Sequence, residues 1–346
     1  MLRLLLLSLL CVPALTAAAR DYPSRAVTLV VPYPISGPTD IRGASRMTKT
    51  YKLMAANAPP AISDTLSRIV QQAIAYESKF PVLLERHPGG ATTRGAHHVA
   101  RSAADGHTLL LASNETMILT PHYAPRVSYD PARDFELAAP LVNMPFALMM
   151  SNGLPFKSIE RLISHIKMRP GEVNYGSSGE GSTGHLAGEL LKRAVGLDMV
   201  HVPHNGGLAA LNGLATGQTS VMFAALPLAL PYVNNERLRI LAVASPRRAE
   251  LLPEAPTLTE AGIQGVEVAA WYGIFAPSGV SPNVVRWLSE RISESINDTA
   301  ARGQLVALGL EVVRSPLSQF ATRIYTEAEK WGPVIRASRI APRSSS

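Results

Sequence analysis

One junction constrains this sequence most: a loop of glycine, serine and threonine (174–184) that runs directly into an amphipathic helix. Apolar residues recur at helical spacing after the loop, at Leu186, Leu190 and Leu191. A hydroxyl at Ser182 or Thr183 suits the cap of this helix. The unpaired N–H groups of the first turn and the positive end of the helix dipole form an anion site. The junction therefore predicts a loop that binds a carboxylate through its backbone, with a plain capped turn as the simpler alternative.

The segment partly matches three motifs of nucleotide-binding and catalytic loops, but it does not meet the full requirement of any of them. Gly179–Gly184 matches G-x-G-x-x-G, but the nearest following acid, Asp198, comes before the roughly 20-residue spacing of a dinucleotide site. A P-loop needs Lys followed by Ser or Thr after its last glycine, where this chain has His185. A nucleophile elbow needs glycine two residues after the serine, and Glu180 stands there after Ser178. We therefore predict neither nucleotide binding nor ester hydrolysis from this loop.

The first 19 residues have the pattern of a signal peptide. Arg3 gives a basic start, an apolar run follows from Leu4 to Val12, and small residues at 17–19 suit cleavage. We expect the leader (1–19) to be removed, so that an exported chain begins near Arg20. No later apolar run approaches the ~18 residues of a transmembrane helix.

Composition and the remaining motifs exclude several classes of site. The single cysteine, Cys11, lies in the leader, so the mature chain has no thiol for a disulfide, for catalysis or for a metal. The net charge of +7 comes from scattered basic residues, which argues against nucleic acid as a partner. His97-His98 and the pair His201 and His204 have no clustered acid beside them in the sequence, and their spacing points the rings apart. We therefore expect no metal and no cofactor.

Strand and helix patterns alternate along the chain. A buried strand over 26–31 is followed by a turn-rich loop, a basic stretch (Ile41–Ile62) and a helix capped by Ser63 or Asp64. Further strands are predicted over 81–84, 108–112, 146–150, 173–175, 199–202, 220–223, 239–244 and 266–275. This order predicts an α/β fold with mostly parallel sheets flanked by helices. Two such units and two polar connectors predict two lobes, with residues 20–124 and 246–346 in lobe 1 and residues 125–245 in lobe 2.

Several short motifs occur in an order that resembles one known family. They are Val30–Pro34 with Thr39-Asp40, His87–Gly90, Asp105–Leu110, Tyr129–Phe135, Asn174–Ser177, His185–Leu190, Val202–His204 and Trp271–Pro277. Together they resemble the periplasmic substrate-binding proteins of tripartite tricarboxylate transporters, the Bug-type receptors, over nearly the whole mature chain. The resemblance implies a Venus-flytrap fold that captures a small carboxylate between two lobes and delivers it to the membrane components of the transporter. We expect a monomer without enzyme activity.

The resemblance also indicates where the ligand binds. The family's carboxylate-holding loops correspond to Tyr33–Asp40 and Ser177–Thr183, and polar residues after predicted strands join them at the same sheet edge. We expect the ligand site to comprise Tyr33, Ser36, Gly37, Thr39, Asp40, Ser113, Asn114, Thr116, Ser177, Ser178, Gly181, Ser182, Thr183, His204, Phe223 and Ala224. Asp40 and Asp64 both fit the family's loop aspartate, because Ile41–Ile62 separates two similar pairs. That basic stretch either covers the site or forms a solvated loop.

One departure from the family bears on the ligand. Many members place a polar residue after the strand that ends at Phe223, where it can meet a ligand amino group, and here Ala224-Ala225 follow. We therefore expect a di- or tricarboxylate or an aromatic acid without an ammonium group. Two alternatives remain open: an exported hydrolase on an α/β fold, and a receptor that serves a sensor protein instead of a transporter.

Overall fold

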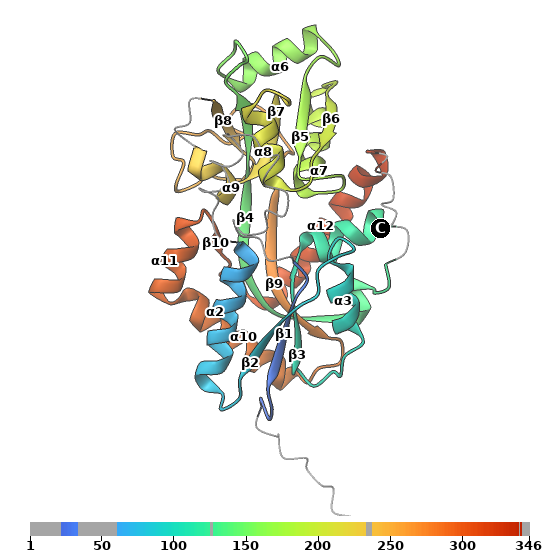
Figure 1. The fold of residues 1–346 in the computed structure, drawn as a ribbon, viewed down its shortest axis with the longest axis vertical. Helices are drawn as coiled ribbons and strands as arrows, with labels where there is room; N and C mark the ends of the chain where they lie inside the picture. Colours follow the sequence, from blue (N-terminus) through green and yellow to red (C-terminus); the bar gives the residue numbers. More distant parts are fainter. Residues whose placement is uncertain (1–21, 34–60, 125–126, 233–236, 339, 341–346) are drawn as a thin grey trace, which may run out of the picture.

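The computed structural model describes residues 22–33, 61–124, 127–232, 237–338 and 340. These residues form two halves, stacked along the long axis in Figure 1 and joined by the long strands β4 (Phe135–Ser151) and β9 (Ala269–Pro277). The predicted signal peptide and the predicted site residues Ser36, Gly37, Thr39 and Asp40 lie outside the described residues, as does most of the basic stretch.

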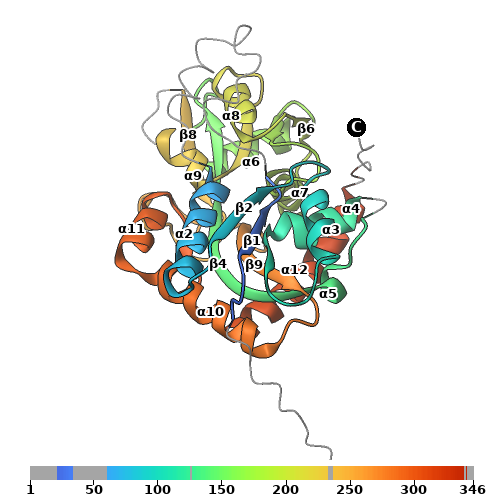
Figure 2. The same cartoon turned by 60° about the horizontal axis from the view of Figure 1, so that its bottom comes forward.

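The first half contains the parallel strands β1 (Val27–Val31), β2 (Val82–Arg86) and β3 (Thr108–Ser113). Strand β1 lies between β2 and β3, while β9 pairs antiparallel with β3 and β4, and β10 (Glu311–Val312) pairs with β4. Helices α2 (Ile62–Glu77), α10 (Pro282–Asn297) and α11 (Thr299–Ala307) cover one face. Helices α3 (Thr93–Ala100), α4 (Thr120–Tyr123), α5 (Pro131–Asp134) and α12 (Leu317–Ala337) lie on the other side (Figure 2).

The second half repeats this plan. Strand β5 (Asn174–Ser177) pairs in parallel with β6 (Val200–Pro203) and β7 (Val221–Ala225), and β7 and β8 (Leu238–Val243) run antiparallel to the end of β4. Helices α6 (Ile159–Met168) and α7 (Thr183–Val195) pack on one face, and α8 (Gly207–Ala215) and α9 (Leu226–Ala229) on the other. The main path of the sheet is therefore β2-β1-β3-β9-β4-β7-β5-β6.

Strand β4 changes partners at one point. Pro145 is its last residue that pairs with β9, opposite Ala269, and Phe146 is the first that pairs with β7, opposite Ala225. The sequence predicted only the part of this strand in the second half (146–150). The antiparallel part before it crosses from one parallel unit to the other. The predicted division into lobes at 124/125 and 245/246 stays a prediction.

The α/β class is confirmed, one local prediction is wrong, and one helix was not predicted. Helix α2 begins at Ile62 with Ala61 as its N-cap, so neither Ser63 nor Asp64 caps it. Asp64 lies in the first turn and pairs with Arg86 at the end of β2, which draws its carboxylate away from the helix backbone. Helix α11 was not predicted, because its apolar residues form no clear stripe.

Gly184 tests how closely α7 must approach β7. A Cβ added at Gly184 would lie 2.7 Å from the carbonyl oxygen of Phe223. We expect Gly184→Ala to lower the free energy of unfolding by about 1–3 kcal/mol, because a backbone atom cannot move aside as a side chain can. In the control Gly303→Ala, an exposed residue of α11 gains a Cβ with no atom within 4 Å, which should raise stability by up to about 1 kcal/mol. Denaturant melts that show no difference between the variants would contradict this packing.

Candidate functional site

Helix α7 begins at Thr183 and is capped by Ser182, as predicted. The Ser182 Oγ accepts from the N–H of His185 at 3.3 Å and donates to the Gly179 carbonyl at 2.7 Å. Other loop amides are paired inside the same half: Gly179 N–H donates to Ser177 Oγ, and Gly181 N–H donates to His185 Nδ1. Ser177 and Ser182 therefore shape the loop from within, and Thr183 is the residue whose N–H and hydroxyl face the other half.

Thr183 contacts the segment that follows β3 in the first half. Asn114 Nδ2 donates to Thr183 Oγ1 at 3.3 Å, and the N–H and hydroxyl of Thr183 each donate to Glu115 Oε1 at 3.4 Å. Asn114 and Thr183 are buried, and Asn114 Oδ1 has no partner among the described residues. A carboxylate of the protein itself thus occupies the position at the start of α7 that the sequence predicted for an anion. We call Asn114, Glu115, Thr116 and Thr183 the loop junction.

Hydroxyl groups surround Thr116 on the side of the first half. The phenol of Tyr33 lies 3.4 Å from Thr116 Oγ1, and Thr92 Oγ1 donates to the same atom at 2.9 Å. Tyr129 donates its hydroxyl to the Thr116 carbonyl at 2.6 Å. Burial, with a smaller contribution from the Glu115 charge, raises the pKa of Tyr33, so its phenol stays neutral and can donate. The junction is therefore bordered by neutral donors.

Glycine and a strained turn bring the two halves close together. A Cβ at Gly181 would lie 2.6 Å from the Tyr123 ring, and the φ of Gly181 is +72°, so only glycine fits there. In the first half, Ala91 and Thr92 have φ values of 51° and 75°, which cost energy for residues other than glycine. This turn holds the Thr92 hydroxyl against Thr116.

Two stacked histidines, His185 and His201, contact the α7 loop through polar ring atoms. The ring centroids of His185 and His201 are 3.7 Å apart with planes 4° from parallel, and His201 Nε2 lies 2.7 Å from Ser177 Oγ. Burial lowers the pKa of His185 to about 4, and burial followed by the His185 charge lowers that of His201 to about 3. Both rings are therefore neutral near pH 7. Because His185 Nδ1 accepts the Gly181 N–H, its own proton lies on Nε2.

The structure separates the predicted site residues into groups. Tyr33, Asn114, Thr116, Gly181 and Thr183 meet at or beside the loop junction, and Ser113 is buried just before it at the end of β3. Ser178 and His204 instead line a separate pocket of about 450 Å³, between the α7 loop and residues 203–206. Phe223 packs in the core with α7, whereas Ala224 packs with α8 on the opposite face of β7.

Three residues at or beside the loop junction were missing from the predicted set. Glu115 directly follows Asn114 after a predicted strand, so its position alone could have indicated it. Thr92 and Tyr123 reach the junction through long-range contacts, which leave no signal in a single sequence.

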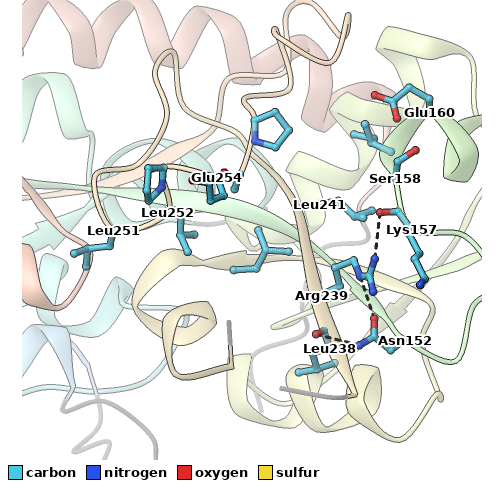
Figure 3. Close-up of a pocket in the computed structure, with 15 residues that line it drawn as sticks. Asn152, Lys157, Ser158, Glu160, Leu238, Arg239, Leu241, Leu251, Leu252 and Glu254 are labelled. Atoms are coloured by element: carbon cyan, nitrogen blue, oxygen red, sulfur yellow. Dashed lines mark hydrogen bonds between the residues drawn. The ribbon is translucent and has the colours of Figure 1, made fainter. Parts of the chain in front are cut away.

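A larger pocket lies away from the junction, beside β8 and the start of α6 (Figure 3). Its volume is about 570 Å³, and none of the predicted site residues that the structure describes lines it. Arg239 crosses it, donating from Nε to Asn152 Oδ1 at 3.3 Å and from Nη1 to the Lys157 carbonyl at 3.5 Å. The Arg239 guanidinium is thus engaged with a neutral amide and a backbone carbonyl of the pocket wall.

A family model described as the tripartite tricarboxylate transporter family receptor matches residues 66–340. The chain belongs to this family. Among curated relatives, the protein BugT of Bordetella pertussis is 27% identical over 324 residues, with 93% of this chain and 92% of BugT covered. The predicted kinship with Bug-type receptors is therefore confirmed.

Solved structures of the family have the same fold. Rpa4515 of R. palustris, solved with adipate, has a TM-score of 0.75 and 28% identity, covering 93% of this chain and all of that one. MatC (Rpa3494) from Rhodopseudomonas palustris, solved with bound malate, has a TM-score of 0.71 and 28% identity, covering 91% and 100%. The fold is that of the two-lobed periplasmic binding proteins.

Because the family consists of solute-binding receptors, this receptor is not an enzyme, and the hydrolase alternative is set aside. Among the described helices, none is long and apolar enough to cross a membrane.

The lowered pKa values of His185 and His201 predict that the protein loses stability in acid. Unfolding returns both pKa values toward about 6.5, so the unfolded chain binds more protons than the folded one between pH 6.5 and 4. The stability contributed by the two rings is then fully present well above pH 6.5 and should fall by about 2 kcal/mol, about 1 kcal/mol for each histidine, as the pH drops from 6 to 5. Thermal melts across this range measure the slope. The variant His185→Asn, whose amide oxygen can still accept from Gly181, should show a shallower slope, and an unchanged slope would contradict the assignment.

Proposed function

We propose that this receptor binds a small organic carboxylate at the loop junction, in the periplasm, and delivers it to the membrane components of a tripartite tricarboxylate transporter. The single observation that carries the proposal is the carboxylate of Glu115 at the start of α7. Thr183 N–H and Oγ1 already act there as carboxylate donors, at the positive end of a 13-residue helix.

A ligand carboxylate would take the place that Glu115 occupies. It would accept from the same two donors of Thr183, and Glu115 would turn away from them. Both contacts to Glu115 are long, at 3.4 Å, so a ligand carboxylate that makes shorter bonds to the same donors can compete for them. Asn114 Oδ1, buried and without a partner among the described residues, suits a ligand hydroxyl next to the carboxylate. Neither group calls for a ligand ammonium.

The family and the predicted leader support the proposed location and partners. The predicted signal peptide (1–19) would direct the chain to the periplasm, and the family description names the transporter type. The adipate and malate of the two solved relatives support a dicarboxylate as the solute. We propose that the receptor acts as a monomer without a cofactor, since each half supplies one side of the junction from the same chain.

Isothermal titration with a panel of acids tests the proposed function. The panel contains adipate, malate, succinate, a tricarboxylate, benzoate and the amino acids aspartate and glutamate. We expect at least one acid without an ammonium group to bind with a Kd in the micromolar range, about −8 kcal/mol, and malate to bind more tightly than succinate because of Asn114. Tighter binding of the amino acids would refute the ligand class, and no binding of any acid would refute the carboxylate receptor.

Glu115→Gln tests the competition directly. The amide keeps the size of the side chain but removes a negative charge beside the ligand, so we expect the best acid of the panel to bind about tenfold more tightly. Glu180→Gln is the matched control, because Glu180 lies in the loop that leads into α7 but lines the separate pocket. Weaker binding by Glu115→Gln would mean that the carboxylate itself holds the ligand.

A further inference from the structure

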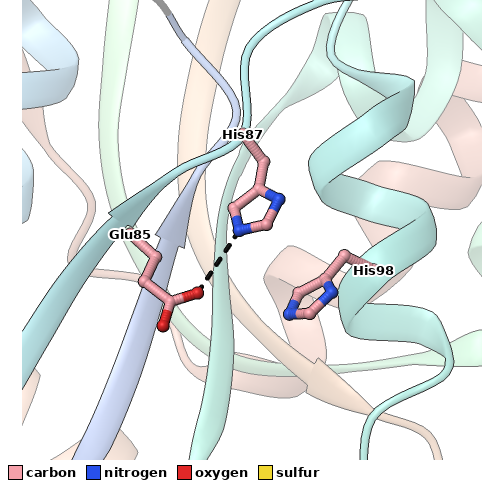
Figure 4. A group of neighbouring side chains, drawn as sticks. All are labelled: Glu85, His87 and His98. Carbon is pink, nitrogen blue, oxygen red and sulfur yellow. Dashed lines mark hydrogen bonds and ion pairs between the residues drawn. The ribbon is translucent and has the colours of Figure 1, made fainter.

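Glu85, His87 and His98 form a cluster on the first half that the function above does not use (Figure 4). Each side chain offers one ligand atom, and these atoms lie within 4.8 Å of one another. His87 Nε2 is 3.3 Å from Glu85 Oε2, and the rings of His87 and His98 stack with centroids 4.6 Å apart. Figure 4 shows the carboxylate and both rings gathered between β2 and α3.

The backbone fixes these three positions. Strand β2 is the end strand of the sheet path, and Glu85 and His87 stand two residues apart, on the same side of the chain. His87 N–H donates to the Val31 carbonyl at 3.1 Å, which extends the β1–β2 pairing by one residue. Helix α3 is held against the same region, because a Cβ at Gly95 would lie 2.8 Å from Pro32. His98 therefore faces β2 through packing and not through chance contact of long side chains.

The donor set matches a specific class of ion. Two imidazoles and a carboxylate, with an open fourth position for water, are a common ligand set for zinc, at ligand distances of about 2.0–2.2 Å. Hard cations such as Mg²⁺ and Ca²⁺ prefer oxygen ligands and would not select two imidazoles. The side chains of Glu85 and His98 are exposed, so small rotations can close the remaining distance without moving the backbone.

We propose that Glu85, His87 and His98 bind one divalent transition-metal ion of the zinc class. The ion joins the end strand β2 to helix α3, and water completes its coordination. This site is separate from the loop junction and does not depend on the proposed function. It could not be predicted from the sequence, because Glu85 and His87 reach His98 only through the fold.

Metal titration of the purified protein tests the proposal. The protein is prepared without a histidine tag, treated with chelator and titrated with zinc chloride by calorimetry, and we expect one ion per chain. His87→Ala and His98→Ala should each weaken binding at least about tenfold, and Glu85→Gln should weaken it less. Cobalt(II) should give the visible absorption of a four-coordinate site, which both histidine variants abolish.

His97→Ala is the matched control, because His97 precedes His98 on the same helix but its Nδ1 contacts the Ser128 carbonyl at 3.2 Å. This variant should bind zinc as the parent protein does. The proposal is overturned if the parent protein binds no zinc, if His97→Ala loses as much affinity as His98→Ala, or if stoichiometric binding survives both His87→Ala and His98→Ala. Circular dichroism of the metal-free variants separates lost ligands from lost folding.

Discussion

The structure depends on the first turn of α7, where a helix begins inside the protein and must find partners for its N–H groups. Ser182 accepts the His185 N–H from within the same half, and Glu115 accepts the Thr183 N–H from the opposite half. Thr183 is only 1% exposed, so water cannot replace these partners. A buried helix start of this kind accepts a negative charge without any basic side chain.

The second constraint is how the two halves are joined. The chain crosses between them on β4 and β9, and the pairing of β4 passes from β9 to β7 at Pro145 and Phe146. Proline has no N–H to contribute to a ladder, so Pro145 donates no hydrogen bond at this point. The pairing of β4 also shifts register near Leu148. The halves are therefore joined where β4 changes both its partner and its register, with a parallel unit on either side.

The sequence predicted those features that depend on residues close together in the chain. The glycine-rich loop, the cap at Ser182 and most strands follow from spacing and residue type within a few positions. The pairing of β4 with β9 could not be predicted this way, because antiparallel partners more than 120 residues apart leave no periodic signal. The same limit hid Thr92 and Tyr123 at the junction, and it separated His98 from its neighbours Glu85 and His87. A chemically similar set of residues becomes a site only when strand ends and helix starts bring it together.

Glu115 changes how selectivity at the junction should be understood. A carboxylate tethered to the turn after β3 competes with a ligand carboxylate at a high effective concentration, and each tenfold of competition costs the ligand about 1.4 kcal/mol. A ligand with one carboxylate and nothing else would gain little over the side chain that it displaces. A ligand with a second polar group can add contacts that Glu115 cannot make, for example to Asn114 Oδ1. If a ligand carboxylate binds at the junction as we propose, the resident carboxylate would compete with it, and acids with two or more functional groups would be favoured over simple monocarboxylates.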